Sequence, residues 1–332
     1  MKLGIFTSFN GNHLKFVESC KEIGIDYEII DILSADWVDL VKKSDCDGFL
    51  CSSTCDSQEK KTILDERYYF VSKVLNKAIY PDFLGLYIHE SKRNMAAWLD
   101  AYGYPHTPTK VFTSKTEAMQ YLSQCKYPIV AKANLGSAAS KVLILKSYMA
   151  AKRYVKNIFP TKRLPILNRG KIYWQKVRNL PVPDLASPQK DYVLFQEYKD
   201  ISHEWRIIKI GDSYFGHQKL LKGQFASGSG LVGWVDPPRE LLKMVHDICE
   251  DGGFYCMDVD IFETKNGEYF INELQASFGS YLDYQMCIDG KHGRYRYVDG
   301  DFIFEEGDFN VHGSAKLKVE HFVEILKRRN VQ

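Results

Sequence analysis

Residues 257–275 read MDVDIFETKNGEYFINELQ, in which an Asn-Gly pair separates two apolar runs. Asn266-Gly267 in this setting predicts a tight hairpin turn, because both residues tolerate positive φ angles. The two runs are apolar enough to form a central strand pair, where Asp is disfavoured. The carboxylates that interrupt these runs therefore suggest a function.

A two-residue turn would pair Asp260 with Glu273 and Asp258 with Gln275. Side chains alternate between the faces of a strand, so these four oxygen-bearing groups would share one face. Facing carboxylates repel one another, whereas a divalent cation placed between them is bound by both. Oxygen-only ligands suit magnesium, so the hairpin predicts a magnesium site. The alternative is an exposed hairpin with polar residues on its solvent side.

Cationic residues upstream of the hairpin suit phosphate binding. Lys132 ends an apolar strand and precedes Asn134–Ser140, whose small residues let backbone N–H groups approach a phosphate. Lys92 opens a predicted helix, where an ordinary solvated lysine is an equal alternative. Arg206 and Lys219 lie in the strands of a second predicted hairpin and point either to solvent or into a charged cleft.

The pattern along the chain changes from α/β to α+β. The first hundred residues alternate apolar runs with helical patterns, which predicts an open parallel sheet with helices on both faces. Strands dominate from residue 192 onward and predict an antiparallel sheet, closed by a helix over 316–329. Gly228–Gly233 matches GxGxxG, but Pro237-Pro238 delays any helix, so a dinucleotide site is not predicted there. A glycine-rich loop that closes over phosphates is favoured over a plain mobile loop.

This order of motifs resembles the ATP-grasp superfamily of carboxylate-activating ligases over nearly the whole chain. The stretch from Val130 to Val142 is similar to the phosphate loop of D-alanine:D-alanine ligases. The resemblance implies an open α/β N-terminal domain, a central lid subdomain with a basic insertion and a C-terminal antiparallel-sheet subdomain. The corresponding ranges are 1–105, 106–195 with the insertion at 147–183, and 196–332.

The resemblance also assigns roles to individual residues. Phosphates would be held by Lys92 and Lys132 with the loop residues Gly136 and Ser137, adenine by Glu197 and Tyr198, and ribose by Glu204. Arg206 and Lys219 would be catalytic cations that meet the γ-phosphate and the acyl phosphate. Magnesium would be held by Asp260, Glu273 and Gln275. Two departures from the family stand out: Gln275 replaces an asparagine, and the phosphate loop keeps a single glycine.

The implied activity is an ATP- and Mg²⁺-dependent ligase that joins a small-molecule carboxylate to an amine. Phosphoryl transfer would make the carboxylate an acyl phosphate, which the amine then attacks. Two alternatives remain: a phosphotransferase on the same fold, and a nucleotide-binding regulatory module without turnover. Turnover and product analysis separate them.

Composition limits the choice of partners. The 332 residues carry 44 Lys and Arg against 42 Asp and Glu, a net charge of +2, so a nucleic-acid partner is not expected. No apolar run is long enough to cross a membrane, and the spacing of the 8 cysteines does not suggest a disulfide framework. We therefore expect a cytoplasmic protein, and a homodimer is one possible oligomeric state. The basic segment 147–183 is either a solvated face or a groove for an anionic substrate.

Overall fold

The computed structural model describes residues 1–136, 142–159, 192–226 and 228–329. Most of the basic segment 147–183, and the predicted phosphate-loop residue Ser137, lie outside these described residues. The chain divides into two compact units, of which the first holds residues 1–54, 62–106 and 200–332 and the second holds 55–61 and 107–199. The three-part division at 105 and 195 stays a prediction.

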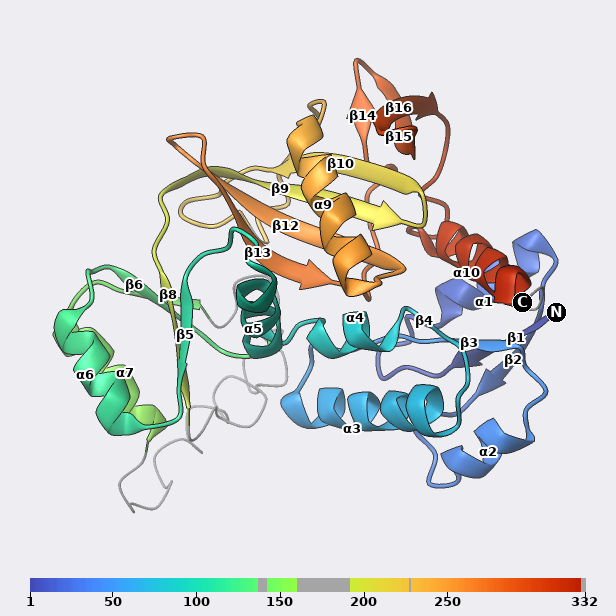
Figure 1. The fold of residues 1–332 in the computed structure, drawn as a ribbon, viewed down its shortest axis with the longest axis horizontal. Helices are drawn as coiled ribbons and strands as arrows, with labels where there is room; N and C mark the ends of the chain where they lie inside the picture. The colour runs from blue at the N-terminus through green and yellow to red at the C-terminus, as the bar shows by residue number, and fades with distance from the viewer. Residues whose placement is uncertain (137–141, 160–191, 227, 330–332) are drawn as a thin grey trace, which may run out of the picture. The chain divides into compact units, whose positions relative to one another are not determined.

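The N-terminal part of the first unit is built on a parallel sheet, as predicted (Figure 1). Its strand order is β2-β1-β3-β4, with bounds Asp26–Ile30, Lys2–Phe6, Gly48–Leu50 and Ile79–Tyr80. Leu3, Ile5 and Phe6 of β1 have no exposed surface, which is typical of a parallel strand covered on both faces. The accompanying helices are α1 (Leu14–Ile23), α2 (Trp37–Lys43), α3 (Gln58–Tyr69), α4 (Phe83–Ile88) and α5 (Lys92–Tyr102). After α3 the chain continues as a short π-helix, Phe70–Val74.

An eight-stranded sheet forms the other part of the first unit, with the order β13-β12-β9-β10-β15-β14 and with β11 and β16 at its margins. The strands are β9 (Ile201–Ile210), β10 (Ser213–Lys219), β11 (Val232–Gly233), β12 (Cys256–Thr264), β13 (Tyr269–Gln275), β14 (Cys287–Ile288), β15 (Lys291–Val298) and β16 (Asp301–Glu306). All its pairings are antiparallel, as predicted. The strands beyond residue 287 were not predicted, because their apolar residues are few and scattered.

Helix α9 (Arg239–Gly252) covers one face of this sheet (Figure 1). Its buried residues Leu241, Leu242, Val245, Ile248 and Cys249 follow the helical repeat and join the sheet's core. No helix follows the GxGxxG stretch until α9, so the residues described there do not form a dinucleotide fingerprint.

The second unit contains a four-stranded sheet of order β5-β8-β6-β7. Its elements are β5 (Thr109–Phe112), α6 (Lys115–Gln124), β6 (Ile129–Lys132), β7 (Val142–Leu145), α7 (Tyr148–Ile158) and β8 (Val193–Glu197). Phe112, Leu122, Val155 and Phe195 share its separate hydrophobic core. The sequence over 106–146 predicts a strand, a helix, a strand, a glycine turn and a strand; the strands and the helix are confirmed, and the turn lies largely outside the described residues.

The hairpin of β12 and β13 has the predicted pairs but not the predicted turn. Asp260 pairs with Glu273 and Asp258 with Gln275, whereas beyond Asp260 the register is shifted by one residue. The two-residue turn is wrong: the Gly267 N–H donates to Thr264 O at 2.9 Å, and four residues, 265–268, lie between the strands. Gly267 has φ +79°, which favours glycine. A β-bulge that adds one residue on β13 restores the predicted pairs.

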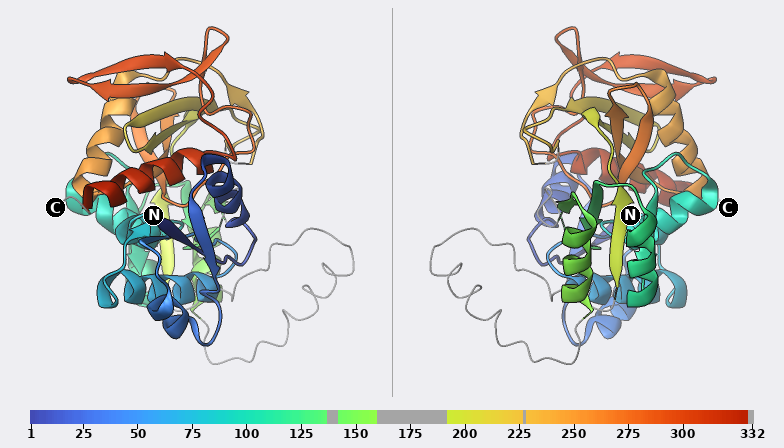
Figure 2. Two further views of the ribbon diagram at one scale, coloured as in Figure 1. Left: turned by 90° about the vertical axis from the view of Figure 1, so that its right-hand side faces the viewer. Right: turned by 90° about the vertical axis from the view of Figure 1, so that its left-hand side faces the viewer.

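The last helix, α10 (Ala315–Arg329), lies beside α1 in the first unit (Figure 2). Val319, Phe322 and Leu326 of α10 belong to the same core as Phe16 and Cys20 of α1. None of the described helices is long and apolar enough to cross a membrane. All eight cysteines are free thiols.

Candidate active site

A cluster of charged side chains lies on one face of the eight-stranded sheet, where β9, β10 and β12 run side by side. The Arg206 guanidinium donates to both carboxylate oxygens of Asp260, at 3.0 and 3.1 Å. Lys219 Nζ donates to Asp260 Oδ2 at 2.7 Å. Asp258, one pleat away on β12, lies 3.2 Å from Arg206 Nε. The structure therefore brings together both predicted catalytic cations and one predicted metal ligand.

Burial makes this cluster electrostatically strong. Asp258 and Asp260 are each 1% exposed, so little water screens them. Burial raises the pKa of Asp260, but the charges of Arg206 and Lys219 outweigh it and hold that pKa well below its usual range. Burial raises the pKa of Asp258 above its usual range, against the opposing charge of Arg206. The two carboxylates thus have distinct environments although one guanidinium contacts both.

The β-bulge brings a further side chain to the cluster. Asn272 is the additional residue on β13, and its side-chain amide donates to Glu204 Oε1 at 2.9 Å. Glu204 has no exposed surface, and its Oε2 lies 3.1 Å from Lys219 Nζ. The proposed contact of Glu204 with ribose stays a prediction. Asn272 was not predicted, because a regular hairpin would direct it to the opposite face.

The remaining predicted metal ligands lie at the edge of the same sheet. Glu273 accepts a hydrogen bond from the Gln275 amide at 2.7 Å, and its other oxygen is 3.6 Å from Lys92 Nζ. Lys92 begins α5 and is 6% exposed, so it is not an ordinary solvated lysine. The structure therefore places Lys92 beside the hairpin.

The donor set of this face fits a magnesium ion. The side chains that the β12–β13 hairpin places on this face offer oxygen ligands only, and carboxylates at positions 204, 258, 260 and 273 lie next to cations at 92, 206 and 219 among the described residues. The hairpin provides two carboxylates, and magnesium usually takes its remaining ligands from water and phosphates.

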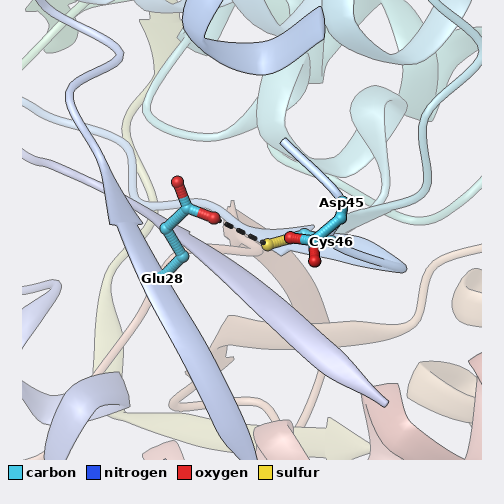
Figure 3. Close-up of side chains that lie close together, drawn as sticks. All are labelled: Glu28, Asp45 and Cys46. Carbon is cyan, nitrogen blue, oxygen red and sulfur yellow. Dashed lines mark hydrogen bonds between the residues drawn. The ribbon is translucent and has the colours of Figure 1, made fainter. Parts of the chain in front are cut away.

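A second acidic group lies at the margin of the N-terminal sheet (Figure 3). Among the described residues, Glu28, Asp45 and Cys46 are the one set of three acid, thiol or imidazole groups whose ligand atoms lie within 4.8 Å of one another. Lys2 Nζ contacts Glu28 at 2.9 Å and Asp45 at 2.5 Å. The side chains of Glu28 and Asp45 are 42% and 77% exposed, and exposed carboxylates around a lysine are common on protein surfaces, so we assign no metal to this group.

The second unit carries the other predicted nucleotide-binding residues. Lys132 ends β6, is 7% exposed and pairs in register with Val142 of β7. Gly136 follows in the described part of the phosphate loop, with φ +153°. The Glu197 N–H donates to Pro108 O at 3.1 Å, and the Glu197 side chain lies 3.4 Å from Lys199. Tyr198 follows β8 directly. Roles of these residues toward a nucleotide remain predictions.

Comparison with solved structures identifies the fold. A D-cycloserine synthetase superposes with a TM-score of 0.60 at 14% identity, covering 98% of this chain and 100% of that one. A RimK-domain ATP-grasp protein from Sphaerobacter thermophilus gives 0.51 at 13% identity, over 82% and 90% of the two chains. The chain has the ATP-grasp fold. N5-carboxyaminoimidazole synthetase from Staphylococcus aureus, complexed with ADP, gives 0.59 at 12% identity over 90% of this ATP-grasp chain and 82% of that one.

Sequence comparison adds nothing to this result: no protein-family model and no curated protein matches the chain. The fold predicted from ordered motifs is nevertheless confirmed. Identity at this level shows the fold alone, so these comparisons assign no reaction to this chain.

Proposed function

We propose that this ATP-grasp chain is an ATP-dependent ligase that activates a carboxylate as an acyl phosphate for attack by an amine. The observation that carries the proposal is the pairing of Arg206 and Lys219 with the buried Asp260, next to Glu273 on the same face. Such a cluster suits phosphoryl transfer, in which a catalyst mainly positions and neutralises oxygens that gain charge. The solved ATP-grasp neighbours that are synthetases support the same class of reaction.

The proposed reaction has two steps. A carboxylate oxygen attacks the γ-phosphorus of ATP, the bond to the β-phosphate oxygen breaks, and ADP leaves. The amine then attacks the carbonyl carbon, phosphate leaves, and the amine loses a proton to give the amide. Arg206 and Lys219 would neutralise the transferred group's oxygens, and Lys92 and Lys132 would bind phosphates. Asp260, Glu273 and Gln275 would hold Mg²⁺, which neutralises phosphate charge when bound.

The proposal is tested by ADP release across pairs of carboxylates and amines, with amino acids, dipeptides and uronic acids as the first panel. A ligase releases ADP and inorganic phosphate in equal amounts, and sustained release needs both co-substrates. A stable phosphoester formed from one co-substrate would instead identify a phosphotransferase. ATP binding without turnover across the panel would identify a regulatory module.

A further inference from the structure

A cavity of about 110 Å³ lies within the first unit, beyond the end of the hairpin of β12 and β13. Its walls come from the first turns of α1 and α10, from the loop after β3, and from the chain just after β13. Ser277 on its wall is two residues beyond Gln275. The cavity is therefore close in sequence to the proposed magnesium ligands and distinct from them.

Lys318 of α10 lines this cavity and is 3% exposed. Its Nζ donates to the Phe278 carbonyl oxygen at 2.5 Å and lies 3.4 Å from the centre of the Phe278 ring. No carboxylate among the described residues forms an ion pair with it. Burial lowers the pKa of Lys318 to about 8. A buried cation without an anionic partner is costly unless something else compensates its charge.

Lys15 of α1 is a second cation on the cavity wall. Its Nζ lies 5.3 Å from the centre of the Tyr281 ring, and no described carboxylate forms an ion pair with it. A Cβ at Gly313 would come within 2.9 Å of Lys15 Nζ, so glycine there leaves room for the ammonium group. Lys15 and Lys318 act on each other as like charges, which lowers the pKa of Lys318 further.

The surroundings of the two lysines favour a negative charge in the cavity. No acidic residue is among the lining side chains that the structure describes. Asp258 acts on Lys318 through its charge, but it is paired with Arg206 and does not line the cavity. Helices α1 and α10 both begin at the wall, and the N-terminus of a helix carries a partial positive charge.

We propose that Lys15 and Lys318 bind an oxyanion, a carboxylate or phosphate group that belongs to one of the two ligase substrates and does not react. That the oxyanion belongs to a substrate rests on the proposed function. That the site binds an oxyanion does not depend on it. The cavity is large enough to admit a single carboxylate or phosphate group. One substrate of the ligase would thus carry an anionic group in addition to the group that reacts.

The test measures oxyanion binding without ATP, using inorganic phosphate and succinate as probes in separate titrations at constant ionic strength. We expect a saturable rise of the melting temperature with one of them, and the probe that binds more tightly identifies the class of oxyanion. Lys318→Met keeps an unbranched side chain one atom shorter and removes its charge. It should raise the dissociation constant at least about tenfold, since hydrogen bonds to charged groups are the stronger ones.

Two further variants make the result decisive. Lys316→Met removes a charge from the same helix turn, but Lys316 pairs with Glu22 at 2.6 Å and does not line the cavity, so binding should be unchanged. Lys15→Met, at a partly exposed position, should weaken binding and replaces Lys318→Met if that variant does not fold. Absence of a saturable shift with both probes would overturn the inference, as would equal binding by parent and Lys318→Met. Failure of ADP release with intact oxyanion binding would overturn only the ligase proposal.

Discussion

Asp260→Asn is expected to lower magnesium-dependent ATP turnover by at least about 10²-fold, the usual loss when one strong electrostatic contact to the transition state is removed. Glu273→Gln should have a similar effect, because the two residues are paired across β12 and β13 and are proposed to hold one cation. The double variant should lose little more than either single one, since groups that act as a unit are not additive. Initial rates at saturating ATP and magnesium measure this.

Asp200→Asn is the matched control for these variants. Asp200 is an exposed aspartate, 63% accessible at its side chain and paired with Lys265 at 2.9 Å, so its loss should leave turnover unchanged. Multiplicative losses in the Asp260 and Glu273 double variant would show that the two carboxylates act separately, contrary to a shared magnesium site.

Arg206→Met is expected to lower the free energy of unfolding by about 3–5 kcal/mol, the usual cost of removing one partner of a buried charge network. The substitution would leave Asp258 and Asp260, both 1% exposed, without the guanidinium that contacts them. Denaturant titration followed by tryptophan fluorescence measures the loss, because Trp205 is buried on the neighbouring position of β9. Adding Asp258→Asn to Arg206→Met should recover part of it.

Arg296→Met gives the comparison for this effect. Arg296 forms an exposed ion pair with Asp212, and exposed pairs contribute about 1 kcal/mol or less. If Arg206→Met cost no more than Arg296→Met, the carboxylates of β12 would not depend on the guanidinium for their stability. If Asp258→Asn recovered nothing, Asp258 would not share that guanidinium.

The hairpin of β12 and β13 shows what the sequence could and could not predict. Period-two alternation and an Asn-Gly turn were enough to pair Asp260 with Glu273. The turn length was wrong, and the bulge at Asn272 compensated for that error, so the predicted pairs were correct for an incomplete reason. The bulged residue Asn272 contacts Glu204 of β9, which is distant in sequence and two strands away in the sheet, and no local sequence signal identifies the bulge.

The sequence identified the cations beside Asp260 but not the buried lysine of the cavity lined by Lys15 and Lys318. Arg206 and Lys219 were found because cations inside strands are unusual, and a resemblance to ATP-grasp ligases placed them in order. Lys318 was missed because its helix is amphipathic and rich in charges, so the sequence suggests a solvated lysine. Its burial depends on segments that are distant in sequence, among them Phe278 after β13, whose carbonyl oxygen and ring it contacts. Long-range packing therefore determines which lysine is unusual.

Trapping by hydroxylamine tests whether the protein converts a carboxylate to an acyl phosphate. With ATP, magnesium and hydroxylamine but no amine, a panel of carboxylates should yield one hydroxamate for each ADP released. The carboxylates of the panel should include members with a second anionic group. The yield should vanish in Glu273→Gln and persist in Asp200→Asn. Release of ADP with a stable phosphoester and no hydroxamate would contradict the account while leaving the ATP-grasp fold unaffected.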